Sequence, residues 1–330
     1  MDDHSVCSTH APAGNKASLR ETSHESHIPS AEVLEAIENV ILEVLKSLAQ
    51  NRAPVLTVAR RSDWRNIEDI YYSDILLFGS QSVVDNIIND ISCMLRIPRR
   101  SLHVLSTTKG FVAGNLSYTE EDGTKVNCTC STTAVTVPSN VQGIKNLISH
   151  AKFMLIVEKD ATFQRLLDDD FCNKLSPCIM ITGRGIPDLN TRLLVRKLWD
   201  SFQIPIFTLM DADPHGVEIM CIYKYGSVSM SFEAHHLTVP SIKWLGLLPS
   251  DLQRLNIRKD VLIPFTKQDQ NKLASIQKRP YIACQPTWKK ELEIMEASKL
   301  KAEIQVLTSL SSDYLSRVYL PNKLQFGGWV

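Results

Sequence analysis

The sequence has no excess of either charge, since 36 Lys and Arg residues balance 36 Asp and Glu residues. This balance excludes a chain coated with positive charge, so any surface that binds nucleic acid must be local and offset by acid elsewhere. The sequence also lacks any apolar run near the ~20 residues that span a bilayer, and we expect no membrane helix. Its start, Met1-Asp2-Asp3, has neither the basic nor the apolar stretch of a secretory signal, and we expect none.

Cysteine pairs of the C-x-x-C type are absent among the eight cysteines, which argues against a zinc ribbon. Cys128 and Cys130 stand two apart in a stretch that alternates like a strand, and nothing nearby in the sequence completes a metal site. We therefore expect reduced thiols in an intracellular protein. The composition, 44% hydrophobic and 22% charged over 330 residues, is that of a globular protein, and the length suggests about two domains.

The first fifty residues divide into two parts. Residues 1–29 are rich in Ser, His and Ala without an apolar period, which predicts a disordered tail. Residues 30–50 predict an amphipathic helix, with apolar positions at spacings of three and four: Val33, Leu34, Ile37, Val40, Ile41, Val44, Leu45 and Leu48. This face packs either on the protein's own core or on a partner, because a predicted linker, 51–68, follows it.

Residues 69–142 predict helices followed by a β-hairpin. Gln81–Leu95 has the apolar period of a helix, and two strand-like runs, Phe111–Tyr118 and Lys125–Val137, flank a turn at Asp122-Gly123. This order suggests a winged helix-turn-helix. In such a domain, phosphate contacts would come from Arg99, Arg100 and Lys109. The simpler interpretation is an ordinary α+β module with a solvated basic rim.

Residues 143–330 predict an α/β domain with a helical extension at its C-terminal end. Three apolar runs, Phe153–Val157, Cys178–Ile181 and Ile204–Met210, alternate with helical segments. Fully apolar strands of this kind are buried on both faces of a parallel sheet. Strand-helix-strand repeats of this order imply right-handed crossovers between parallel neighbours. The fold class is therefore α/β and α+β in two domains.

Acidic side chains follow two of these strands. Glu158 ends the first strand, and Asp211 and Asp213 end the third. Because the carboxyl ends of parallel strands share one edge, we expect the three carboxylates to lie together and to bind Mg²⁺, which prefers oxygen ligands. Glycines in Thr182–Pro187 would let a phosphate approach the backbone at the same edge. The alternative is that these are only solvated strand ends and turns.

Several segments resemble the A-type proteins of topoisomerase VI, and in particular their relative that initiates meiotic recombination in animals. Asp69-Ile70-Tyr71-Tyr72-Ser73-Asp74 is similar to the family's active-tyrosine segment. Val157-Glu158-Lys159-Asp160-Ala161 and Asp211-Ala212-Asp213-Pro214-His215-Gly216 resemble the two acidic motifs of its Toprim domain. Tyr319-Leu320-Pro321-Asn322-Lys323 also fits, and the resemblance runs from Ser30 to Val330.

This resemblance implies a winged-helix domain (69–142) and a Toprim domain (143–330) in a nuclear homodimer that cuts duplex DNA. Tyr72 would attack a phosphodiester and leave a 5′-phosphotyrosyl link, with one attack on each strand making a double-strand break. Glu158, Asp211 and Asp213 would hold Mg²⁺, and Glu158 would also relay a proton. The helix Val33–Leu48 would dock on a B-type partner protein.

The chain departs from the family pattern just before the tyrosines. Glu68 stands where the family has an Arg four residues before the attacking tyrosine. Several dozen mostly helical residues are also missing between a segment like Trp64-Arg65-Asn66-Ile67 and Asp69. Two other interpretations therefore stay open. One is a catalytically impaired short form that binds DNA or partners, and the other is a nuclease without a covalent step.

Overall fold

The structure, a computed structural model, describes residues 65–102, 104–129, 134–175 and 177–330. They belong to one compact unit, Arg60–Val330. The predicted tail (1–29), the predicted helix (30–50) and most of the predicted linker (51–64) lie outside the described residues. So does the side chain of Arg100.

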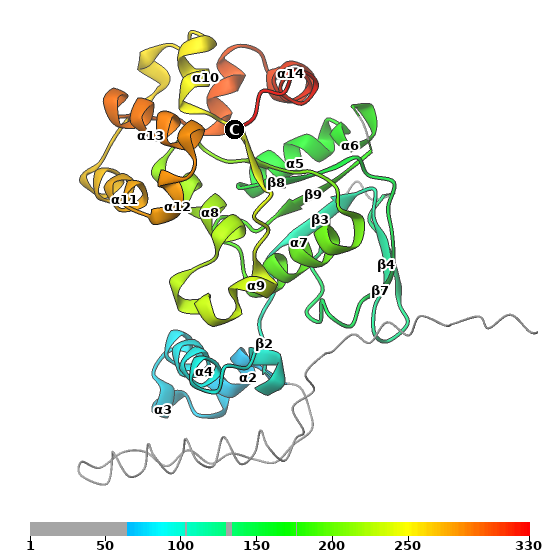
Figure 1. The fold of residues 1–330 in the computed structure, drawn as a ribbon. Coiled ribbons are helices and arrows are strands. Elements are labelled where there is room, and N and C mark those ends of the chain that lie inside the picture. The colour runs from blue at the N-terminus through cyan, green and yellow to red at the C-terminus, as the bar shows by residue number, and fades with distance from the viewer. Residues whose placement is uncertain (1–64, 103, 130–133, 176) are drawn as a thin grey trace, which may run out of the picture. The chain divides into compact units, whose positions relative to one another are not determined.

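A six-stranded sheet forms the centre of this unit, in the order β11-β10-β8-β9-β3-β6 (Figure 1). Four neighbouring strands are parallel: β8 (Phe153–Val157), β9 (Cys178–Thr182), β10 (Ile206–Leu209) and β11 (Lys243–Gly246). Every residue of β8, β9 and β10 is buried, as the unbroken apolar runs predicted. The predicted α/β class is confirmed for this part of the chain.

Helices cover both faces of the sheet, and the alternation of side chains along β8 shows which lies where. Met154 and Ile156 pack with α7 (Leu189–Phe202) and α8 (Pro214–Tyr225) in one hydrophobic cluster. Leu155 and Val157 pack with α5 (Asp160–Asp168) and α6 (Phe171–Lys174) in a second cluster. The sheet is therefore a buried layer between two helical layers, and its strand ends lie at the rim.

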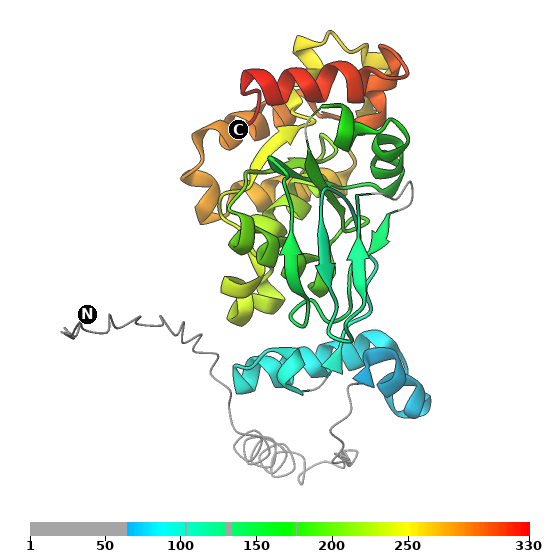
Figure 2. The same cartoon turned by 90° about the vertical axis from the view of Figure 1, so that its right-hand side faces the viewer.

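Each of the two predicted strands of the wing is broken into two shorter strands, and one of these also joins the central sheet. The first run breaks into β3 (Phe111–Gly114) and β4 (Ser117–Thr119), and the second into β5 (Lys125–Asn127) and β6 (Val135–Thr136). β4 and β5 pair around the predicted turn, with β7 (Lys145–Ile148) on the other side of β4. β3 and β6 also pair antiparallel, as the two runs predicted, but β3 pairs on its other side with β9 and so extends the central sheet (Figure 2).

The N-terminal part of the described chain has a small core of its own. It contains β1 (Arg65–Asn66), α2 (Ile67–Ser73), α3 (Ile75–Phe78), α4 (Gln81–Leu95), η1 (Arg99–Leu102) and β2 (Val104–Leu105). The buried apolar side chains of this core are Ile67, Val84 and Ile88. The helix predicted at Gln81–Leu95 is confirmed, whereas a complete winged helix is not established by these elements.

The C-terminal part is made mostly of helices. The remaining elements are η2 (Val228–Glu233), α9 (Ala234–Leu237), α10 (Pro249–Arg254), η3 (Lys259–Val261), β12 (Ile263–Pro264), α11 (Lys267–Gln277), α12 (Pro280–Ala283), α13 (Pro286–Ser298), β13 (Leu300–Lys301), η4 (Ile304–Ser309), η5 (Leu315–Tyr319) and α14 (Leu320–Phe326). Across the described residues, none of the helices has the length and apolar character needed to cross a membrane.

Candidate active site

The acidic side chains after β8 and β10 lie next to each other. Oε2 of Glu158 accepts a hydrogen bond from the backbone N–H of Asp211 at 2.8 Å. The side chain of Asp213 caps the start of α8 by accepting a hydrogen bond from the Gly216 N–H at 2.6 Å. Parallel pairing of β8 with β10 brings these strand ends together, as the sequence predicted.

Burial and mutual repulsion disturb the ionisation of two of these carboxyls. Desolvation, followed by the charge of Asp211, raises the pKa of Glu158 to about 7. Desolvation also raises the pKa of Asp211, although Lys159 opposes that shift. Burial therefore disfavours the charged form of both carboxyls, and a nearby positive charge offsets that cost.

Gly216 fits closely against this acidic cluster. A Cβ at this position would lie 2.6 Å from the carbonyl oxygen of Asp211 and 3.0 Å from Oε2 of Glu158. Real Cβ atoms do not approach backbone so closely, so any side chain here would push the two acidic segments apart. The glycine of the second acidic motif therefore has a steric reason to be there.

Lys159 is a member of the site that the sequence analysis assigned no role. Its ammonium lies 2.9 Å from Oδ2 of Asp211 and 3.0 Å from Oε1 of Glu303. The other oxygen of Asp211, Oδ1, accepts a hydrogen bond from the N–H of Ile304 at 2.8 Å. Lys159 directly follows Glu158, and that adjacency was the only available signal, because Glu303 and Ile304 come from a distant part of the sequence.

The donor set suits a hard divalent cation by its chemistry, because all three side chains offer carboxylate oxygens. Within the described ranges, however, no three His, Cys, Asp or Glu side chains are grouped so that they would hold a metal ion as they stand. At Asp211, Lys159 already provides a positive charge. The residues fit Mg²⁺ on the condition that Asp211 exchanges this ammonium for the ion.

The loop after β9 lies beside the first acidic strand. The N–H of Gly185 donates to the carbonyl oxygen of Glu158 at 2.9 Å. Arg184 pairs with Asp160 at 3.0 Å and stacks over the ring of Phe111. The loop Thr182–Pro187, where a phosphate was expected to approach the backbone, therefore lies next to Glu158 and contains Arg184.

The two adjacent tyrosines of α2 have different surroundings. Tyr71 packs against the small core made by Ile67, Val84 and Ile88, whereas the side chain of Tyr72 is 68% exposed. Their rings lie 5.1 Å apart at a tilt of 56°. Of the pair, Tyr72 is therefore the one whose hydroxyl is open to a substrate from outside.

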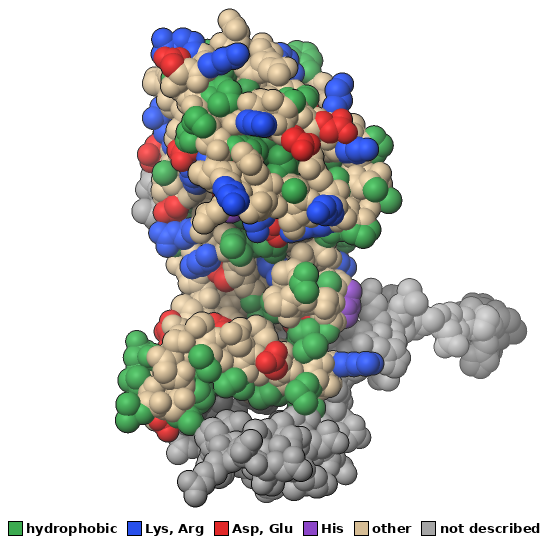
Figure 3. Space-filling view, turned by 90° about the vertical axis from the view of Figure 1, so that its left-hand side faces the viewer, with side chains coloured by type: hydrophobic (Ala, Val, Ile, Leu, Met, Phe, Trp, Pro, Cys, Tyr) green, Lys and Arg blue, Asp and Glu red, His purple; other side chains and the backbone are tan. Residues whose placement is uncertain are grey.

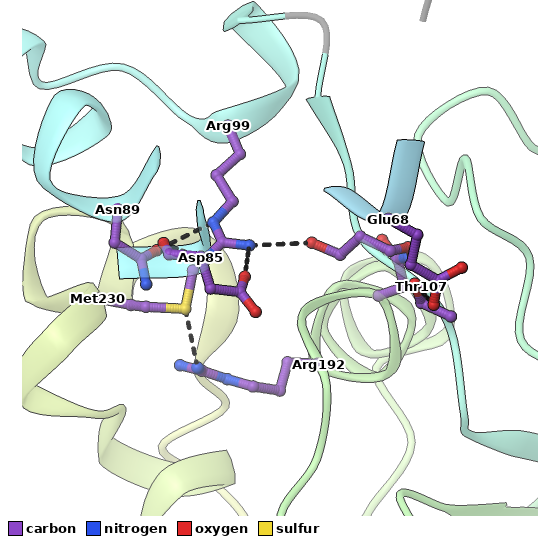
Figure 4. Close-up of polar contacts among 9 residues, drawn as sticks. Glu68, Asp85, Asn89, Arg99, Thr107, Arg192 and Met230 are labelled. Carbon is purple, nitrogen blue, oxygen red and sulfur yellow. Dashed lines mark hydrogen bonds and ion pairs between the residues drawn. The ribbon is translucent and has the colours of Figure 1, made fainter. Parts of the chain in front are cut away.

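Arg99, predicted to contact DNA phosphate, is buried and engaged within the protein (Figure 4). Its guanidinium donates to Oδ1 of Asn89 at 2.6 and 2.9 Å and to Oδ1 of Asp85 at 2.9 Å. A guanidinium held in this way is not presented to a phosphate, because its donors are already paired. We assign Arg99 instead to holding the turn after α4 against that helix.

Lys109 is exposed, and its backbone is fixed to the α/β part of the chain. The N–H groups of Lys109 and Gly110 donate to Oδ2 of Asp188 at 2.8 and 3.2 Å. Asp188 also caps α7 through the N–H of Thr191. The base of the Lys109 side chain is therefore rigidly placed, while its ammonium stays available to a partner.

The sequence of this chain matches two family models. Residues 153–324 match the Toprim domain of the topoisomerase 6 A-type/Spo11 proteins, and residues 65–104 match "Type IIB DNA topoisomerase". The chain belongs to the topoisomerase 6 A-type/Spo11 family. The parallel sheet and its acidic edge are therefore those of a Toprim domain, as the resemblance implied.

Relatives of this family cover most of the chain. The chain is 64% identical to meiotic recombination protein SPO11 of Homo sapiens over 353 residues, covering 91% of this chain and 89% of the human protein. It is 61% identical to the protein of the same name from Mus musculus, with the same coverage. It is 39% identical over 307 residues to the A3 protein of DNA topoisomerase 6 from Oryza sativa subsp. indica, covering 93% of this chain and 68% of the rice protein.

The human alignment also shows that this chain is shorter within the matched region. The alignment runs over 353 positions, whereas 91% of 330 residues is about 300. About 50 aligned positions of the human protein, 353 less 300, therefore have no counterpart here. The size agrees with the several dozen residues expected to be missing before Asp69.

Proposed function

We propose that this chain is a Mg²⁺-dependent DNA transesterase that starts meiotic recombination by making double-strand breaks. The observation that carries the proposal is the contrast between Tyr71, packed in a core, and Tyr72, exposed on the same helix. The family membership and the human and mouse relatives named for meiotic recombination support it. An exposed phenol becomes a nucleophile only beside a base, a cation or a metal, and the acidic cluster would offer these.

In the proposed reaction, Oη of Tyr72 attacks a backbone phosphorus and the bond from phosphorus to the 3′-oxygen breaks. The products are a 5′-phosphotyrosyl link and a 3′-hydroxyl, and the phenol proton passes through a base to the leaving oxygen. We assign that relay to Glu158, which lies at the end of β8 beside Asp211. Tyr72 of one protomer would act at the acidic cluster of the other.

The metal has a defined place in this proposal. Glu158, Asp211 and Asp213 would hold Mg²⁺, which would offset charge on the non-bridging oxygens and on the leaving 3′-oxygen. Lys109 and Arg100 would contact DNA phosphates and position the duplex. In the dimer that we propose, these contacts would occur once per strand.

The experiment that tests the proposal is covalent trapping on DNA. The protein is mixed with duplex DNA and Mg²⁺, stopped with denaturant, and assayed for DNA that migrates with protein. Tyr72→Phe should abolish the trapped species, while the neighbouring control Tyr71→Phe should largely spare it. Trapping that survives Tyr72→Phe would show that the nucleophile is another residue, and a free 5′-phosphate on the product would favour a nuclease without a covalent step.

A second candidate function is a short form that binds DNA or partners but does not cut. Two observations favour it: Glu68 replaces the family's Arg and accepts a hydrogen bond from Thr107 at 3.0 Å, and α3 is poorly covered. The side chains of Ile75 and Leu77 are 47% and 44% exposed, and that of Leu76 is 99% exposed. Figure 3 shows hydrophobic side chains gathered on the surface of the N-terminal part of the described chain.

The variant Glu68→Arg separates the two candidates if the chain itself does not cut DNA. Cleavage gained by Glu68→Arg would locate the defect at this one position. No gain would indicate that the winged-helix part is incomplete without the missing residues. Retained DNA binding without cleavage in both proteins would establish the short form as a binding protein.

We also propose three associations for the chain, in line with the names of its topoisomerase 6 relatives. The chain would form a homodimer and would bind a B-type partner protein through the predicted helix Val33–Leu48. It would reside in the nucleus. Co-purification with a B-type partner should be lost when Ile37 and Val44 are both changed to Asp. A tagged chain found outside the nucleus of meiotic cells would contradict the last of these.

A further inference from the structure

The two carboxylate oxygens of Asp211 are held by groups of very different mobility. Oδ1 accepts from the backbone N–H of Ile304 at 2.8 Å, and Oδ2 contacts the ammonium of Lys159 at 2.9 Å. The Ile304 segment cannot easily move away, because Ala302 and Ala212 bridge through two backbone hydrogen bonds of 2.8 and 3.2 Å. The Lys159 side chain is 29% exposed and hangs on a flexible four-carbon stem. Oδ2 is therefore the exchangeable side of Asp211.

Glu303 gives this ammonium a second position. Its Oε1 lies 3.0 Å from the Lys159 nitrogen, and its side chain is 54% exposed, against 6% for Asp211. If Lys159 leaves the buried carboxylate, it keeps an opposite charge beside it and moves toward water. When a cation takes the place of Lys159 at Asp211, both the buried carboxylate and the ammonium therefore keep an opposite charge beside them.

A divalent cation and an ammonium at one carboxylate oxygen repel each other, so each weakens the other's binding there. We propose that Lys159 is an exchangeable counter-ion of the metal site, which occupies Oδ2 of Asp211 in the free protein and passes to Glu303 when a divalent cation binds. This inference rests on the proposed function in one respect, namely that Glu158, Asp211 and Asp213 take the cation. It adds that the Lys159–Glu303 pair sets the affinity for that cation.

The inference makes two predictions of opposite sign. Lys159→Met removes the competitor, so Mg²⁺ should bind more tightly, by up to about fivefold, the amount expected for one partly exposed ion pair. Glu303→Gln removes the alternative position, so Lys159 stays on Asp211 and Mg²⁺ should bind a few-fold more weakly. Coulomb interactions alone would give the same two signs, because the two variants remove opposite charges. The double variant Lys159→Met/Glu303→Gln therefore decides: under exchange, Glu303→Gln has little further effect once Lys159 is absent, whereas independent charge effects add.

The measurement is a calorimetric titration of the full chain with MgCl₂ in the absence of DNA, so that cleavage plays no part in the readout. Matched controls come from α13, where Lys289 and Glu293 form an exposed pair at 3.9 Å. Lys289→Met and Glu293→Gln remove the same charges away from the acidic cluster and should leave the affinity within about twofold of the original. Lys159→Arg keeps the charge and should restore weak binding if Lys159→Met tightens it.

The outcomes distinguish this inference from the proposed function. If the original chain binds Mg²⁺, and Asp211→Asn abolishes that binding, the metal site stands. Lys159→Met that then binds no more tightly would overturn the exchange alone. If the original chain and Lys159→Met both fail to bind Mg²⁺, the exchange and the metal part of the proposed function both fall. Circular dichroism spectra that match the original chain would show that Lys159→Met and Glu303→Gln are folded.

Discussion

Oε2 of Glu158 lies 2.8 Å from the backbone nitrogen of Asp211 and accepts its hydrogen bond. One acidic side chain thus fixes the backbone that carries the next. The bond joins the end of β8 to the end of β10, so the spacing of the two acidic motifs depends on Glu158 as an acceptor and not only as a charge. Substitutions of Glu158 can separate its role as a hydrogen-bond acceptor from its role as a charge.

Glu158→Gln should leave the free energy of unfolding unchanged or slightly higher at pH 8. It keeps an oxygen for the Asp211 N–H and removes a charge that burial and Asp211 disfavour. Glu158→Ala should lower the free energy of unfolding by about 1–3 kcal/mol, because it leaves that buried N–H without a partner. Denaturant unfolding followed by circular dichroism measures both, and an equal loss in the two variants would contradict the acceptor role.

Arg99→Met should destabilise the N-terminal part of the described chain by about 2 kcal/mol, since it leaves Asp85 and Asn89 without their shared donor. Arg99→Lys should not rescue it, because an ammonium cannot reproduce the fork of the guanidinium. Limited proteolysis near α2 and α4 reports the change. Arg258→Met is the control, because Arg258 forms an exposed pair with Asp260 at 3.4 Å. If Arg99→Met weakens DNA binding without lowering stability, Arg99 contacts DNA phosphate after all.

Lys224 predicts a pH dependence of stability. Its ammonium is buried and donates to the carbonyl oxygens of Pro240 and Ile242, and burial lowers its pKa from 10.5 to about 8. Between pH 8 and 10.5 the unfolded chain therefore binds more protons than the folded chain, and this group makes the folded state more stable as pH rises. Below pH 8 its contribution is constant.

The test compares the chain with Lys224→Met, since buried tyrosines and cysteines also titrate in alkali. The free energy of unfolding of the original chain, relative to that of Lys224→Met, should increase steadily from pH 8 to pH 10. Urea unfolding at several pH values gives both curves. If the difference in free energy of unfolding between the two proteins does not change over this range, burial does not lower the pKa of Lys224.

Lys109→Ala should weaken DNA binding a few-fold and lower the slope of log affinity against log salt by about 1, as expected for one lost phosphate contact. The effect should be similar for different DNA sequences, because phosphate contacts carry no base information. Fluorescence anisotropy with labelled duplex measures it. Lys125→Ala, which removes an exposed lysine from β5, serves as the control, and equal slopes in all three proteins would remove Lys109 from the DNA interface.

Much of the central sheet was predictable because the signal was local. β8 and β9 are short apolar runs, and their burial on both faces follows from that composition. The edge shared by Glu158 and Asp211 followed from parallel pairing alone. The pairing of β3 with β9 was not predictable in the same way, because an alternating run does not encode which distant strand it will join.

The acidic cluster was predicted in its members but not in its electrostatics. Lys159 pairs with Asp211 and also with Glu303, which lies 92 residues after Asp211 in a segment with no distinctive motif. The contacts of Arg99, which was expected to bind DNA phosphate, also depend on the folded chain. Next to Arg100 it looks like part of a basic surface, and only the folded turn shows that it points back to Asp85 and Asn89.

The bridge between Ala212 and Ala302 gives the last thirty residues an influence on chemistry that none of them performs. A protein shortened just before Ala302 would still contain both acidic motifs and the whole parallel sheet. It would nevertheless lose the N–H that orients Asp211 and the carboxylate that shares Lys159. Premature termination late in such a chain would therefore remove contacts that hold the acidic cluster in place, while leaving both acidic motifs intact.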